Sequence, residues 1–115
     1  MPPVLQASGT QTMTVGTEHT LCDIAVAGSF TFEADLSVML DGDIFELRVY
    51  KIALTGGSRQ GCLYALFGDA QFPIDAYKIS DPVGNDLTDA GSLRYTAKQI
   101  AGTSRNMPWK ALNYG

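Results

Sequence analysis

The sequence is poor in charge and in the residue types that perform chemistry near neutral pH. Only 17% of its 115 residues are Asp, Glu, Lys or Arg, against about a quarter in typical globular proteins. It has two cysteines and one histidine, with no C-x-x-C pair, so we expect no zinc or other metal site and no cofactor. The histidine, His19, lies near no recognisable nucleophile motif. We therefore expect no catalytic residues and no enzymatic activity.

Clusters of basic residues and long apolar runs are also missing. Lys and Arg are scattered singly and the net charge is −4, which argues against nucleic acid as a partner, because binding to phosphates needs clustered cations. No apolar run reaches the roughly 20 residues of a membrane span, so we expect no membrane partner. The segment Met1–Gln6 has neither the basic start nor the apolar core of a secretion signal, which predicts synthesis in the cytoplasm.

The two cysteines, Cys22 and Cys62, both lie within apolar strand-like patterns. A thiol in such a pattern usually behaves as a small buried hydrophobe. Because a reducing compartment disfavours disulfides, two buried free thiols are the favoured interpretation, and a disulfide between them is the alternative.

What the sequence does contain is apolar–polar alternation with a period of two, interrupted by turn-forming residues. The clearest alternating runs are Phe30–Leu36, Phe45–Lys51 and Leu93–Lys98, while Cys62–Phe67 is apolar on both faces. Between Phe45–Lys51 and Cys62–Phe67, residues Thr55–Ser58 read Thr-Gly-Gly-Ser, which is the strongest hairpin signal in the chain. Strands with one apolar face are typical of antiparallel sheets.

Further strands are expected at Gln11–Val15, His19–Val26, Phe72–Lys78 and Met107–Leu112. About eight strands with these spacings predict an all-β fold, either an antiparallel β-sandwich or a small closed barrel. Residues 1–12 show no apolar periodicity, so we expect an extended N-terminal arm, followed by a single β-sandwich domain over residues 13–115.

Two oxygen-rich segments superficially resemble calcium loops. The first holds Asp41, Asp43 and Glu46, and the second runs from Asp81 to Asp89. Neither has the residue order of an EF-hand loop. Since Asp and Asn in turns commonly bond to nearby backbone, we interpret both segments as turns.

Two runs that join a strand to a turn are the most distinctive in the chain. Gly42–Tyr50 reads Gly-Asp-Ile-Phe-Glu-Leu-Arg-Val-Tyr, and Ile100–Asn106 reads Ile-Ala-Gly-Thr-Ser-Arg-Asn and is followed by Trp109. Together with Gly16–Leu21 and the hairpin Thr55–Arg59, they make most of the chain resemble a family of small virion structural proteins of tailed bacteriophages, similar to capsid decoration or cement proteins.

This resemblance implies a non-enzymatic role on the outer surface of the phage head, and therefore localisation to the virion. Such proteins commonly form homotrimers and bridge neighbouring subunits of the major capsid protein. The alternative is a tail or neck component, or a glycan-binding, adhesin-like β-module in which Trp109, Tyr114 or Tyr77 would face outward near Asp81. The resemblance carries over no catalytic residues.

Candidate interface residues come from both ends of the chain. A flexible arm can grip a lattice by ordering on binding. A lone Trp in a last strand is most often part of the core, and otherwise it anchors an interface. The candidates are Pro2, Pro3, Val4, Leu5, Arg105, Trp109 and Tyr114.

Overall fold

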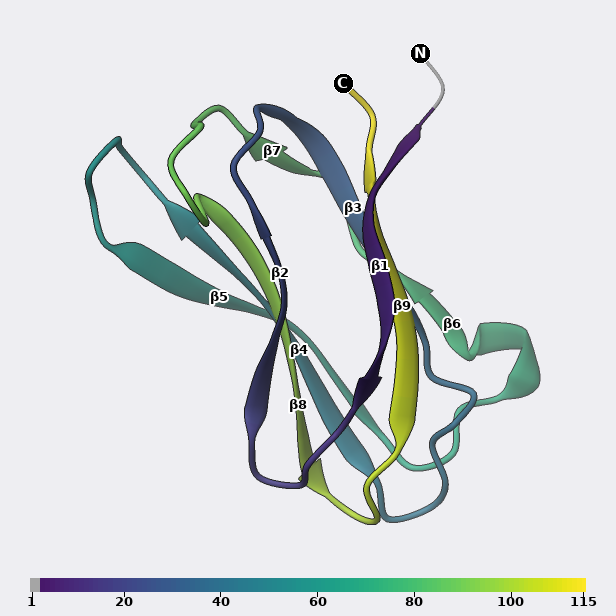
Figure 1. Cartoon of the computed structure of the whole chain (residues 1–115). Coiled ribbons are helices and arrows are strands. Elements are labelled where there is room, and N and C mark those ends of the chain that lie inside the picture. Colours follow the sequence, from purple (N-terminus) through teal and green to yellow (C-terminus); the bar gives the residue numbers. More distant parts are fainter. Residues whose placement is uncertain (1–2) are drawn as a thin grey trace.

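Two antiparallel sheets pack face to face as a sandwich in the computed structural model, which describes residues 3–115 apart from the side chain of Leu63 (Figure 1). Sheet A has the order β1 (Val4–Thr12), β9 (Asn106–Asn113), β3 (Gly28–Asp35) and β6 (Tyr77–Ile79), and β7 (Val83–Asn85) also pairs with β3. Sheet B has the order β2 (Glu18–Ile24), β8 (Leu93–Ala101), β4 (Ile44–Ile52) and β5 (Arg59–Gly68). The predicted all-β sandwich is confirmed, and the alternative of a closed barrel is excluded.

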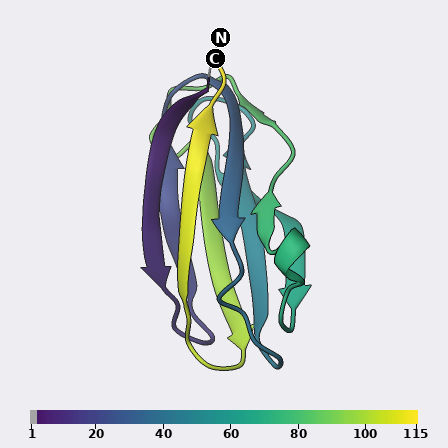
Figure 2. The same cartoon turned by 90° about the vertical axis from the view of Figure 1, so that its right-hand side faces the viewer.

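The strand order gives the sandwich a specific topology. β6 and β7 lie beside the same strand, β3, and count as one interrupted strand. Sheet A then reads 1-9-3-6/7 and sheet B reads 2-8-4-5, which is the order of a double-sheet jelly roll. In this arrangement β1 begins and β9 ends at the same end of the sandwich (Figure 2).

Much of the core is made by apolar residues of the predicted alternating runs 30–36, 45–51 and 93–98. Phe32 of β3 stacks on Tyr95 of β8 in the opposite sheet, with ring centroids 5.0 Å apart, and on Trp109 of β9 at 6.0 Å. The largest side chains that are fully buried with them are Phe30, Phe45, Met13, Ile24, Leu36, Met39, Leu47, Leu93 and Met107. Dense packing of this kind ties the two sheets together.

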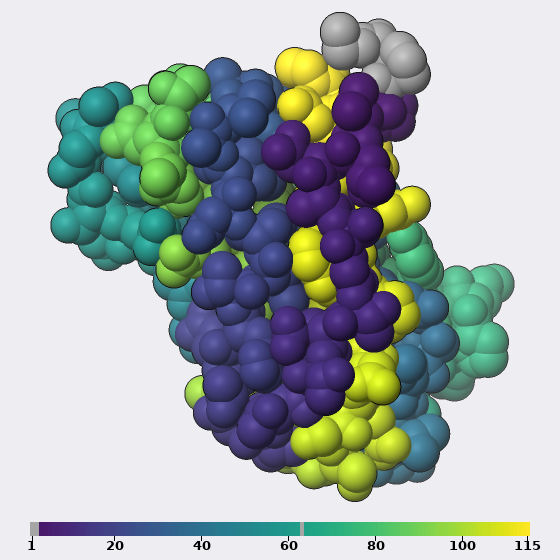
Figure 3. Space-filling model, in the orientation of Figure 1, coloured from purple at the N-terminus to yellow at the C-terminus, as the bar shows by residue number. Residues whose placement is uncertain are grey.

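The predicted hairpin at Thr55–Ser58 is confirmed. It joins β4 to β5, which pair from Ile44 opposite Gly68 to Ile52 opposite Arg59. This β4–β5 hairpin projects beyond the rest of the sandwich and is visible in teal at the upper left of Figure 3.

The strand predicted over Phe72–Lys78 is only partly present. Pro73–Asp75 form a 3₁₀ turn (η1), and strand pairing begins at Tyr77, because the proline that opens the turn has no N–H for a sheet ladder. Beyond β6, the Ser80 N–H donates to Phe32 O and the Phe32 N–H donates to Ser80 Oγ, both at 2.8 Å. In the part of the chain that the structure describes, no helix is long and apolar enough to cross a bilayer.

Residues 4–12 are not a free arm, so the expected N-terminal arm is wrong for this segment. They form β1, which runs along β9 from Val4 opposite Asn113 to Thr12 opposite Asn106. The strand expected at Gln11–Val15 is therefore only the end of β1. No side chain of β1 is fully buried, so the strand belongs to the fold through its backbone pairing.

Candidate functional site

The two runs that the sequence analysis singled out meet at one end of the sandwich. Arg105 Nε donates to Asp43 Oδ2 at 2.7 Å, and the backbone N–H groups of Leu40 and Thr103 donate to the same carboxylate at 2.9 and 3.1 Å. Asp43 is only 1% exposed. Burial alone would raise the pKa of Asp43, but these three donors outweigh it and hold the pKa below its usual value. Asp43 is therefore a buried carboxylate that organises two loops.

Gln99 completes this end of the sandwich. It is fully buried, and its Nε2 donates to the carbonyl oxygens of Ala101, the last residue of β8, and Thr103 at 3.1 and 2.7 Å. Its Oε1 accepts from the backbone N–H of Arg105 at 3.2 Å. Gly102 has a φ of +96°, and a Cβ there would collide with Asp43. The Gly-Thr-Ser-Arg turn is thus shaped to fit against Asp43, which gives it a structural role.

The residues considered for catalysis or metal binding are spread over the fold. The Thr14 N–H donates to His19 Nε2 at 3.1 Å, which uses the imidazole in a local turn. Asp41 and Asp89 accept backbone N–H groups at 3.3 and 2.9 Å, and Glu46 pairs with Arg48. Among residues 3–115 there is no group of three or more His, Cys, Asp or Glu side chains that could hold a metal ion.

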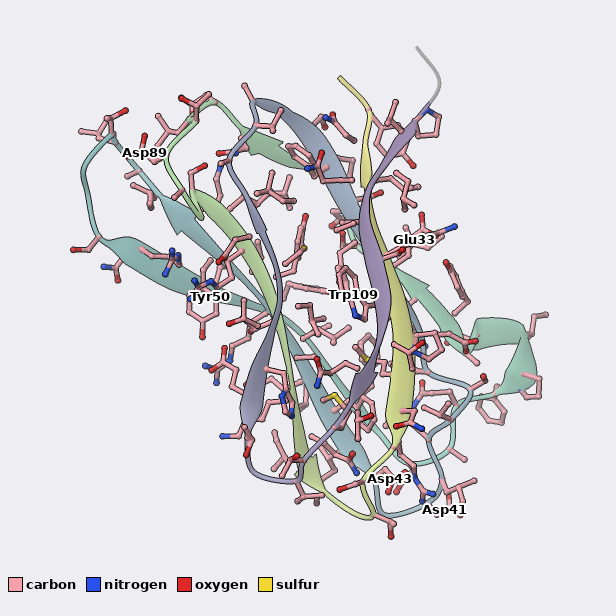
Figure 4. The ribbon with its side chains drawn as sticks, viewed as in Figure 1. Glu33, Asp41, Asp43, Tyr50, Asp89 and Trp109 are labelled. Atoms are coloured by element: carbon pink, nitrogen blue, oxygen red, sulfur yellow. The ribbon has the colours of Figure 1, made fainter. Side chains whose placement is uncertain are left out.

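The C-terminal interface candidates have different surroundings. Trp109 is half-buried and points between the sheets, where it stacks on Phe32 (Figure 4). Arg105 is held by Asp43, while Tyr114 is exposed just beyond β9. Trp109 therefore packs with the core, and an interface role for Arg105 or Tyr114 stays a prediction.

The N-terminal candidates gather where β1 begins. Pro3, Val4 and Leu5 are exposed, and Leu5 lies opposite Leu112 of β9. The remaining candidate, Pro2, lies outside the described residues. These side chains are brought close to the C-terminal end of β9, but their contact with a partner stays a prediction.

The cysteines are placed in different environments. Cys22 of β2 is half-buried, and burial raises the pKa of its thiol to about 11. Cys62 of β5 is exposed, so the expectation that both thiols are buried is wrong for this residue. No disulfide links these two residues.

A patch of large apolar side chains stands on the surface of η1 and β6. It consists of Phe72, Ile74, Tyr77 and Ile79, which are 79%, 98%, 48% and 64% exposed. We call these four residues the η1–β6 patch; η1 projects at the side of sheet A in Figure 2. The sequence predicted a strand over Phe72–Lys78, and a strand prediction did not indicate this patch. The proline after Phe72 was the available signal, since proline within such a run argues against a regular strand.

A polar cavity of about 350 Å³ lies on the outer face of sheet B. Its lining comes from all four strands of that sheet, and the Tyr50 side chain points away from the sandwich there (Figure 4). The lining residues are Glu18, Thr20, Tyr50, Arg59, Arg94 and Thr96. Sequence reasoning did not bring these residues together, because their proximity depends on the order of strands in the sheet. We call this feature the sheet B cavity.

The charged groups of the sheet B cavity are held in place by one another. The Tyr50 hydroxyl and Thr96 Oγ1 each donate to Glu18 Oε2 at 2.6 Å, and Arg94 binds both carboxylate oxygens of Asp23. Burial tends to raise the pKa of Glu18, but the hydrogen bonds from Thr96 and Tyr50 and the nearby Arg48 lower it overall. The hydrogen bond from Arg94 likewise lowers the pKa of Asp23. Both carboxylates are ionised at neutral pH.

Known proteins offer no direct guide to these surfaces. Comparison with protein-family models, with curated proteins and with solved structures finds no match to this chain.

Proposed function

We propose that the protein is a non-enzymatic structural component of a tailed-phage virion. In this role it decorates the outer surface of the head as a homotrimer and bridges subunits of the major capsid protein. A decoration protein stabilises the shell by mass action, because it binds the assembled lattice in preference to free subunits. The resemblance carried by Gly42–Tyr50 and Ile100–Asn106 supports this role, and so does the jelly-roll order, which is also found in viral capsid proteins.

The observation that carries the proposal is the η1–β6 patch. It places four large exposed apolar side chains within eight consecutive residues, Phe72 to Ile79. Contiguous exposed apolar surface commonly marks a site of protein interaction. Burial of such side chains stabilises a complex by about 1.5–3 kcal/mol each. A surface of this kind, on a rigid two-sheet scaffold, suits docking onto a larger assembly.

The negative net charge of the protein favours a partner with a basic surface. With a net charge of −4, it would be attracted to basic patches on the outside of a shell. The interface between the copies of a closed trimer repeats around one axis, so the same residues would serve in every copy.

Co-sedimentation tests the proposal directly. Purified protein is mixed with heads of the cognate phage that lack it, and the heads are pelleted. The proposal expects the protein in the pellet, and sedimentation of the protein alone should show a trimer. Heads that do not retain the protein would contradict it, and retention by isolated tails alone would move the protein to the tail or neck.

A further inference from the structure

We propose that the sheet B cavity is a binding site for a neutral saccharide, with Tyr50 as the platform on which a sugar ring stacks. This inference is independent of the virion role, because it concerns a different face of the molecule from the η1–β6 patch. It also uses none of the aromatic residues that the sequence analysis considered for sugar binding. Of those, Trp109 points into the sandwich and the Tyr77 hydroxyl donates to Glu33 at 2.7 Å.

Two glycines leave room for planar side chains that line the site. Gly61 of β5 lies directly opposite Tyr50 of β4, and a Cβ at Gly61 would come within 2.6 Å of the Tyr50 ring. The ring therefore lies across the neighbouring strand in space that a side chain would otherwise occupy. Gly91 likewise leaves room for Arg59, because the Arg59 guanidinium occupies the position that a Cβ at Gly91 would need. Both planar groups are thus laid along the sheet beside the cavity.

The ring of Tyr50 is also fixed at its tip. Its hydroxyl donates to Glu18 Oε2 at 2.6 Å and accepts from Arg48 Nη1 at 3.3 Å. An aromatic group held at both its face and its tip loses little conformational entropy when a ligand stacks on it. Pre-organisation of this kind favours binding of a weakly interacting ligand.

Hydrogen-bonding groups of both kinds surround the platform. Arg59 Nε donates to Gly91 O at 3.0 Å and Arg94 is held by Asp23, so both guanidinium groups have fixed positions with further N–H groups to offer. Glu18 Oε1 keeps acceptor capacity beside Arg48, which is 3.7 Å away. A sugar presents hydroxyls that both donate and accept, together with an apolar face of C–H groups, and this combination matches the lining.

The charges around the cavity nearly cancel. The cations Arg48, Arg59, Arg94 and Lys98 face the carboxylates of Glu18, Asp23 and Glu46. A site for a multiply charged anion such as phosphate would need an excess of unpaired cations. The balance therefore favours a neutral, polyhydroxylated ligand. The volume of about 350 Å³ is at the small end of ligand sites, which fits one or two sugar rings.

Chemical-shift titration of the full-length, isotope-labelled protein tests the inference. The probes are the methyl glycosides of glucose, galactose, mannose and N-acetylglucosamine, each raised to millimolar concentration, with inorganic phosphate as a separate arm. The expected result is saturable shifts for at least one glycoside at Glu18, Thr20 and Thr96. Tyr50→Leu should weaken the binding about tenfold or more, equivalent to about 1.4 kcal/mol. Tyr114→Leu, which removes an exposed tyrosine elsewhere, should leave it unchanged.

A second variant keeps the inference testable if Tyr50→Leu does not fold. Gly61→Ala keeps Tyr50 but displaces its ring, and it should weaken the same glycoside while the spectrum of the core stays that of the native protein. If no glycoside shifts these signals, or if Tyr50→Leu binds as the native protein does, the inference is wrong. Saturable phosphate binding at these residues without glycoside binding would also overturn it, in favour of an anion site. None of these results depends on whether the protein binds phage heads.

Discussion

Arg105 pairs with Asp43 across 62 residues of sequence and joins the turn before β9 to the loop before β4. The Asp43 side chain is buried, whereas the Arg105 side chain is 23% exposed. An unpaired charge on the buried Asp43 would therefore be strongly destabilising, whereas water can solvate part of Arg105 without its partner.

Replacement of Asp43 should be costly because Arg105 Nε and the Leu40 and Thr103 N–H groups all donate to its carboxylate. Asp43→Asn removes the charge that three donors surround, and we expect the free energy of unfolding to fall by about 3 kcal/mol, the lower end of the range for broken buried pairs. Urea denaturation measures the change. Asp41→Asn, two residues away and exposed, is the matched control and should cost at most about 0.5 kcal/mol. Equal effects of the two substitutions would show that the pair does not stabilise the fold.

The acid stability of the protein should follow from three carboxylates. The pKa values of Asp43, Glu18 and Asp23 are all lowered in the folded state. At low pH the unfolded chain binds protons before the folded protein does, so stability is fully present above the ordinary carboxyl pKa of about 4 and falls as pH drops below it. The expected slope is about 1.4 kcal/mol per pH unit for each proton taken up.

Urea midpoints measured from neutral pH down to the acid transition test this slope. In Asp43→Asn the slope should be smaller, because one of the three depressed groups is gone. An unchanged slope in that variant would assign the pH dependence to other carboxylates.

Replacement of Gly102 should destabilise the fold for two reasons, which can be measured separately. Its φ of +96° disfavours any side chain, and a Cβ there would collide with Asp43. Gly16 has a similar φ of +87° but open space around it, so Gly16→Ala isolates the backbone cost, which is about 1–2 kcal/mol. Gly102→Ala should cost about 2 kcal/mol more, since it also displaces the buried carboxylate. Thermal unfolding of the two variants measures the difference, and equal costs would exclude the steric contribution.

The sequence predicted the strands whose alternate residues are buried. Phe30–Leu36 and Phe45–Lys51 alternate because one face of each strand meets the core. The predicted hairpin at Thr55–Ser58 brings Tyr50 and Gly61 onto neighbouring strands but does not give their register, because the loop between Ile52 and Arg59 is two residues longer than the predicted turn. The Asp43–Arg105 pair had no signal in the sequence, because the two residues approach only through the order of strands in space. β1 left no signal for a related reason: its pairing with β9 uses backbone groups and leaves none of its side chains fully buried.

The η1–β6 patch should be dispensable for folding and required for docking. Phe72→Ser combined with Ile74→Ser removes two side chains that are 79% and 98% exposed, so the free energy of unfolding should change by no more than about 0.5 kcal/mol. Under the proposed function, binding to phage heads should weaken about a hundredfold, because roughly 3 kcal/mol of apolar burial is lost.

The matched control for the patch is Leu54→Ser on the β4–β5 hairpin, which removes a side chain of similar exposure, 77%. It should leave both stability and head binding unchanged. If the double variant still co-sediments as the native protein does, the patch is not the docking surface.

Removal of residues 1–12 should destabilise the fold, because it deletes β1 and uncovers the edge of β9. Gly9 of β1 also lies against the Trp109 indole, since a Cβ there would be 3.4 Å from the ring. We expect the melting temperature to fall by roughly 10–20 °C, which corresponds to about 3–4 kcal/mol for a domain of this size. Fluorescence of Trp109, the single tryptophan, should shift to longer wavelength as water reaches the indole. A shorter deletion of residues 1–3, which ends before β1, should leave both readings unchanged. If the longer deletion keeps the native melting temperature and emission, β1 contributes little to the stability of the sandwich.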